Sequence, residues 1–191
     1  PYYMSAFGGV LPDGYSYSGY ARQGFFELCG VAVLDLLVIF LAGVLAKRNE
    51  NGRKPVAVRI YSAVFSLITI LLICSAMSKM IMYIGEYGLT GLRFYTSWFM
   101  ILLGIVFLVL ILHEIFPGMK TVATLFISFT VMLGALCFCD PDARIAQYNV
   151  ESYLSGEIAE TDTGSLAMLS EGAAPYVERL NCLLYTSDAA D

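Results

Sequence analysis

Four apolar runs constrain this chain more than any other feature of its sequence. They cover residues 25–46, 56–84, 92–112 and 121–139. A helix needs about 20 apolar residues to cross the hydrocarbon core of a bilayer, and each run supplies that length. The runs therefore predict an all-α fold, an integral membrane bundle of four transmembrane helices within residues 25–139.

Polar sequence flanks the four runs on both sides. Residues 1–24 are rich in Tyr, Gly and Ser, and we expect them to form an interfacial segment, where tyrosine rings with a polar tip are favoured. Residues 140–181 hold a cluster of acids, and we expect them to form a short helical tail outside the membrane. Asp140 and Pro141 are typical of a helix start, which predicts the first tail helix over residues 141–154.

The composition agrees with a membrane location. Hydrophobic residues make up 58% of the chain and charged residues 14%, whereas soluble domains carry about 25% charged residues. The basic residues gather in one short connector and form no surface large enough to favour nucleic acid. We therefore expect the lipid bilayer as a partner and no nucleic acid.

The connector between the first two runs predicts how the chain crosses the membrane. Residues 47–55 contain four basic side chains, and Arg59 follows just beyond them. Short basic connectors stay on the cytoplasmic side. We therefore expect a multi-pass protein of the bacterial cytoplasmic membrane, with the N-terminal side and the tail 140–181 both extracytoplasmic.

Several short motifs carry a family resemblance. The most specific is Tyr-Gly-Leu-Thr-Gly-Leu-Arg at residues 87–93, and Arg-Ile-Ala-Gln-Tyr-Asn-Val follows at residues 144–150. With residues 20–28, these motifs resemble the bacterial polytopic membrane family catalogued as domain of unknown function 4173, which is related to 4153. The resemblance covers residues 2 to about 180 and implies a membrane architecture, but no reaction.

Both ends of the sequence suggest a piece of a longer protein. The chain begins Pro-Tyr-Tyr, which is not a natural start, and members of the resembled family are larger. Residues 182–191 resemble the in-frame translation of a sequencing-library adapter. We therefore expect natural protein sequence to end near Asn181, with further spans upstream.

Asp35 lies near the centre of the first apolar run. A charged aspartate at that depth costs roughly 2.5–3.5 kcal/mol on insertion scales. One interpretation is a proton or cation site. The other is a neutral or hydrogen-bonded aspartate that contacts Ser66, Thr69 or Ser75 on the next helix and holds the two spans together.

A second group of polar residues falls near the predicted outer rim. Residues 75, 79, 83 and 86 recur at three- and four-residue spacing and so share a helix face. Together with Glu27 and Arg93, the spacing predicts a rim cluster of Glu27, Lys79, Glu86 and Arg93. Such a cluster could receive an external ligand or partner, or it could be an ion-paired network that locks the helices and the turn at residues 88–90.

No metal or cofactor site is expected. His113 is the only histidine, and a zinc-protease motif needs a second histidine on the same helix face. We expect His113 and Glu114 to be solvated or capping groups at the end of the third span. No cysteine pair has metal-ligand spacing, and no catalytic constellation is apparent.

Three function classes remain open from the sequence. The first is a non-enzymatic sensor, scaffold or assembly partner that binds an extracytoplasmic protein through the tail 140–181. The second is a secondary transporter or proton-coupled permease, suggested by Asp35. The third is an envelope-lipid enzyme whose catalytic part lies upstream.

Overall fold

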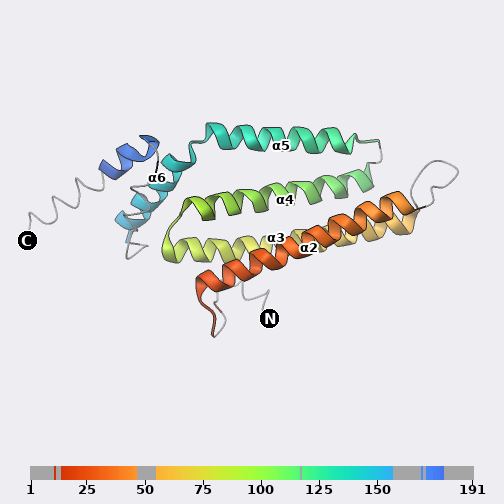
Figure 1. Ribbon diagram of the computed structural model, residues 1–191, viewed down its shortest axis with the longest axis horizontal. Coiled ribbons are helices and arrows are strands. Elements are labelled where there is room, and N and C mark those ends of the chain that lie inside the picture. The colour runs from red at the N-terminus through yellow and green to blue at the C-terminus, as the bar shows by residue number, and fades with distance from the viewer. Residues whose placement is uncertain are drawn as a thin grey trace, which may run out of the picture. The chain divides into compact units, whose positions relative to one another are not determined.

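The computed structural model describes residues 11, 14–46, 55–116, 118–156, 169 and 171–178. In these ranges every regular element is a helix (Figure 1), which confirms the all-α prediction. The elements are α2 (Tyr17–Leu45), α3 (Val56–Tyr87), α4 (Gly91–Ile115), α5 (Thr121–Phe138), α6 (Pro141–Leu154) and the short 3-10 helix η1 (Glu171–Ala173). The basic connector 47–54 and residues 157–168 and 179–191 lie outside the described ranges.

Helices α2 to α5 are each long and apolar enough to cross a bilayer. The four predicted membrane spans are therefore confirmed. Helix α2 begins at Tyr17, before the apolar run that predicted it, because the Ser16 side chain caps it by accepting from the Gly19 amide at 3.1 Å. The apolar run marks only the part of the helix suited to lipid, whereas the cap sets where the helix starts.

Helix α3 is longer than a bilayer core requires. Its 32 residues correspond to about 48 Å at 1.5 Å per residue, against a hydrocarbon core of about 30 Å. A helix of this length has to tilt in the membrane or extend beyond it.

The chain divides into two compact units, one of residues 1–79 and 99–131 and one of residues 80–98 and 132–191. In the first unit α2 runs beside α3 (Figure 1). The buried positions of α2 include 21, 24, 28, 32, 35 and 39, and those of α3 include 62, 66, 69, 73 and 76. Steps of three and four residues place each set on one helix face, and we call the contact between these faces the α2–α3 seam.

The second unit contains the folded part of the tail. Helix α6 matches the predicted first tail helix, with Asp140 as its N-cap and Pro141 in its first turn. Its buried residues Ala146 and Val150 form a small core with Ala173. Side chains that pack around this core are Tyr153, Leu169, Tyr176 and Val177. The tail is therefore helical in the ranges described, with its own apolar core.

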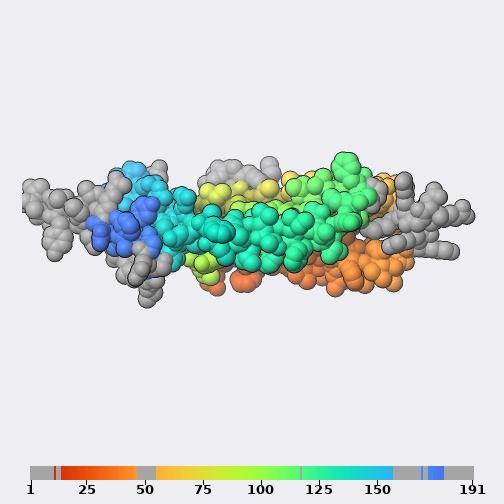
Figure 2. Space-filling view, turned by 90° about the horizontal axis from the view of Figure 1, so that it is seen from above, coloured from red at the N-terminus to blue at the C-terminus, as the bar shows by residue number. Residues whose placement is uncertain are grey.

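Helix α5 contrasts with the α2–α3 seam. None of its residues is buried against the rest of the described chain, and large apolar side chains such as Val122, Phe126 and Ile127 are exposed. Figure 2 looks onto this surface. A helix that is apolar on all sides belongs in lipid or against another membrane helix.

Candidate functional site

Asp35 lies on the α2–α3 seam and is 9% exposed. Thr69 of α3 is fully buried opposite it. The Thr69 hydroxyl is hydrogen bonded to Asp35 Oδ2 and, at 3.1 Å, to the Phe65 carbonyl oxygen of its own helix. Thr69 is one of the three residues that the sequence offered as partners for Asp35. The contact joins the two helices through a polar pair, as hydrogen bonds between membrane helices do.

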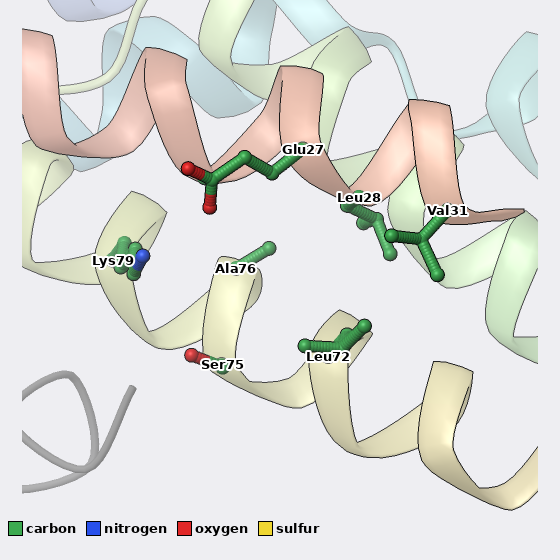
Figure 3. A pocket seen from close by; sticks show the side chains of 8 residues that line it. Glu27, Leu28, Val31, Leu72, Ser75, Ala76 and Lys79 are labelled. Carbon is green, nitrogen blue, oxygen red and sulfur yellow. The ribbon is translucent and has the colours of Figure 1, made fainter. Parts of the chain in front are cut away.

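Glu27 and Lys79 line a cavity on the same seam (Figure 3). Lys79 is 1% exposed, and its Nζ lies 4.3 Å from the centre of the Tyr20 ring. Glu27 adds an attractive charge–charge interaction with Lys79. In Figure 3 the Glu27 carboxylate extends toward the end of the cavity where Lys79 lies. The structure thus brings two members of the expected rim cluster together.

The cavity beside these residues is small. Its volume is about 20 Å³, which is room for about one water molecule. The residues that line it are Gly24, Glu27, Leu28, Val31, Leu72, Ser75, Ala76 and Lys79. The buried Ser75 hydroxyl has no hydrogen-bond partner among the described residues. A single water would satisfy that hydroxyl, whereas an organic substrate would not fit this cavity.

Gly24 allows Lys79 to lie across α2. A Cβ atom at position 24 would stand 2.8 Å from Lys79 Cδ and 3.2 Å from Lys79 Nζ. The missing side chain therefore gives the lysine its path toward the Tyr20 ring. Sequence reasoning missed this role, although Gly24 shares a helix face with Ala21 and Leu28, which marks it as a position of close helix approach.

Arg93 and Glu86 belong to the second unit. The Arg93 Nη1 donates to the carbonyl oxygens of Tyr87, at 3.0 Å, and Gly88, and its guanidinium lies 3.9 Å from the centre of the Tyr83 ring. Gly88 has a φ of +75°, which a glycine adopts without strain. Arg93 therefore closes the turn between α3 and α4, while Glu86 is exposed.

Asn149 of α6 holds the same turn from the tail. Its Oδ1 accepts from the Leu89 amide at 2.7 Å, and its Nδ2 donates to the Leu89 carbonyl oxygen at 2.7 Å. Asn149 is itself buried, at 5% exposed. These two bonds join the two motifs that carry the family resemblance, residues 87–93 and 144–150. The sequence motifs drew attention to both segments, but they did not predict that the two segments contact each other.

Of the two roles expected for Glu114, a solvated or a capping group, the structure excludes the solvated one. Glu114 is 8% exposed, and its Oε2 lies 3.8 Å from Arg59 Nε. Arg59 Nη2 also donates to the Glu114 carbonyl oxygen. Arg59 lies near the start of α3, and its guanidinium reaches the end of α4, where its positive charge offsets the buried negative charge of Glu114.

His113 also contacts a neighbouring helix, because its Nδ1 lies 2.6 Å from Thr121 Oγ1.

We expect Arg59→Met to lower the free energy of unfolding by about 1–2 kcal/mol, because it leaves the buried Glu114 carboxylate without its guanidinium. The measurement is detergent-induced unfolding in mixed micelles, followed by circular dichroism. Adding Glu114→Gln to Arg59→Met should recover most of the loss. A double variant no more stable than Arg59→Met alone would contradict the pairing.

No group of three side chains suited to bind a metal occurs in the described part of the chain. Several of the polar contacts instead join two helices, as Asp35 and Thr69 do, or a helix and a turn, as Asn149 and Leu89 do.

Comparison with known proteins identifies one family. The family described as "Domain of unknown function (DUF4153)" matches residues 2–180. This match confirms the resemblance of the chain to family 4153, and the assignment to family 4173 stays a prediction. No curated protein and no solved structure matches the chain.

Proposed function

We propose that this chain, which belongs to the DUF4153 family, is a non-enzymatic membrane protein that serves as a sensor, scaffold or assembly partner through its tail. The observation that carries the proposal is the pair of hydrogen bonds from Asn149 to Leu89. They hold α6 in a fixed position on the turn between α3 and α4. A tail held in this way presents a defined surface, which a partner can bind at a lower entropic cost than a disordered segment.

The surface that this arrangement presents is polar and acidic in part. Tyr148 and Glu151 are exposed on α6, while Ile145, Ala146 and Val150 of the same helix are buried. We propose that residues 140–181 form an extracytoplasmic tail that binds a protein, and that residues 1–24 lie on the same side. We propose in addition that the protein is located in the bacterial cytoplasmic membrane. The proposal also includes the assignment to family 4173 and an adapter origin for residues 182–191.

The test compares two amide residues on α6. Asn149→Leu removes both bonds to the turn and should weaken docking of the tail by about 2 kcal/mol, at about 1 kcal/mol per hydrogen bond. Gln147→Leu is the matched control, because the only described bond of Gln147 is local, to Glu151 at 3.0 Å. A photoreactive residue at position 148 then reports on partner contact in native membranes.

We expect one protein adduct from position 148 in the parent chain and in Gln147→Leu, and a weaker adduct in Asn149→Leu, because the docked state of the tail loses about 2 kcal/mol of stability. Immunoblots of the membrane fraction check that the three proteins are inserted equally. An undiminished adduct in Asn149→Leu would contradict the role of docking, and the absence of an adduct in the parent chain would contradict the tail as a binding surface.

The second candidate function is a proton-coupled permease. The observation that favours it is a buried carboxyl group, Asp35, in a membrane helix beside a hydroxyl. Intramembrane acids commonly mark proton or ion pathways. Asp35→Asn should then abolish proton-dependent flux of the transported solute in vesicles, and unchanged flux would count against this candidate.

A further inference from the structure

The Thr69 hydroxyl has one proton but two oxygen neighbours. One neighbour is Asp35 Oδ2, and the other is the Phe65 carbonyl oxygen at 3.1 Å. A hydroxyl group can donate one hydrogen bond and accept others. Thr69 can therefore share its proton between the two oxygens, or donate to one of them and accept a hydrogen bond from the other. A carboxylic acid at Asp35 is a group that can donate this second bond.

The charges around Asp35 agree with a neutral side chain. Asp35 has no cation partner among the described residues. The two cations of α3 are engaged with other carboxylates, Arg59 with Glu114 at 3.8 Å and Lys79 with Glu27. A buried carboxylate without a counter-ion is strongly disfavoured in an apolar helix pair, whereas the neutral acid needs only a hydrogen-bond partner.

We infer that Asp35 is a proton-binding site on the α2–α3 seam, and that it holds its proton in the resting protein. In the protonated state the Asp35 O–H donates to Thr69 Oγ1, and the Thr69 O–H donates to the Phe65 carbonyl oxygen. When the proton leaves for water, the Thr69 O–H rotates and donates to the Asp35 carboxylate. The number of protons balances, because Asp35 loses one and water gains it.

Two further buried hydroxyl groups lie on α3, one on each side of Thr69 in the sequence. Ser66 and Ser75 are buried on α3, at 1% and 2% exposed, and their hydroxyls have no hydrogen-bond partner in the described ranges. The cavity at Ser75 has room for about one water molecule. Hydroxyl groups both donate and accept hydrogen bonds, so they offer polar partners to a water molecule on the seam, whereas the surrounding leucine and valine side chains do not.

Infrared spectroscopy of the full chain in lipid vesicles tests the site. The difference between the parent chain and Asp35→Asn should contain one carboxylic-acid carbonyl band, and that band should shift when water is replaced by D₂O. Asparagine keeps the size of the side chain and an N–H donor for Thr69. A Thr69→Val variant leaves Asp35 in place and should shift the same band, while Thr69→Ser should leave it unchanged.

The outcomes separate cleanly. Absence of an acid band that depends on Asp35 means that Asp35 is ionised, which overturns the inference. An acid band that stays in place in Thr69→Val means that Asp35 does not donate to Thr69, which also overturns it. A band that stays unshifted in D₂O means a sealed structural proton, which overturns the exchangeable site. The inference is independent of the tail. It is necessary for the permease candidate but not sufficient, so an exchangeable band with normal flux in Asp35→Asn would reject only the permease.

Discussion

Lys79→Met is expected to lower the free energy of unfolding by about 3 kcal/mol, in the range for breaking a buried pair of charges. Lys79 is 1% exposed and contributes both to the attraction with Glu27 and to the contact with the Tyr20 ring. Methionine fills a similar volume but carries no charge. It therefore leaves the half-buried Glu27 carboxylate without the ammonium group, although Gln23 Nε2 still donates to it at 2.8 Å.

A double variant distinguishes charge from packing. Glu27→Leu added to Lys79→Met removes the second charge, and apolar replacement of a whole buried pair is often neutral. We expect the double variant to regain most of the stability, measured by detergent-induced unfolding in mixed micelles. If it is as unstable as Lys79→Met alone, the lysine acts through its packing across Gly24 and not through its charge.

Gly24→Leu is the second substitution with a large expected effect. A Cβ atom alone would stand 2.8 Å from Lys79 Cδ, so a leucine must push Lys79 away from Tyr20 or separate α2 from α3. Overpacking of this kind costs about 3 kcal/mol. The expected result is a matching loss in the free energy of unfolding.

The same helix provides the control for this prediction. Gly30 is exposed, and a Cβ atom there would meet nothing within 4 Å. Gly30→Leu adds the same side chain to α2 but should change the stability little, because lipid accommodates it. Equal losses for Gly24→Leu and Gly30→Leu would show that the effect comes from the loss of glycine in a helix and not from the close approach of Lys79.

Structural features that depend on one helix, or on two consecutive helices, could be predicted from the sequence. The four spans followed from run length, and α6 followed from Asp140 and Pro141. Thr69 was among the partners considered for Asp35 because two antiparallel spans place residues at similar depth side by side. Local periodicity and depth are both encoded in a short stretch of chain, which is why a single sequence reveals them.

Structural features that depend on contacts between distant segments could not be predicted from the sequence. Asn149 and Leu89 lie far apart in the chain, and nothing in either motif says that one binds the other. The position of Glu114 at the end of a span predicts a solvated or capping group, but its burial depends on where the Arg59 side chain lies. Gly24 matters only through Lys79 on the next helix. Each of these depends on the tertiary position of a particular side chain.

The central claim is that Asn149 fixes the tail on the turn between α3 and α4, and hydrogen exchange at the Leu89 amide tests it most directly. That amide donates to Asn149 Oδ1 at 2.7 Å, so docking of the tail protects it. In Asn149→Leu we predict exchange at Leu89 at least about tenfold faster than in the parent chain, with Gln147→Leu like the parent. Unchanged exchange at Leu89 in Asn149→Leu would contradict the account.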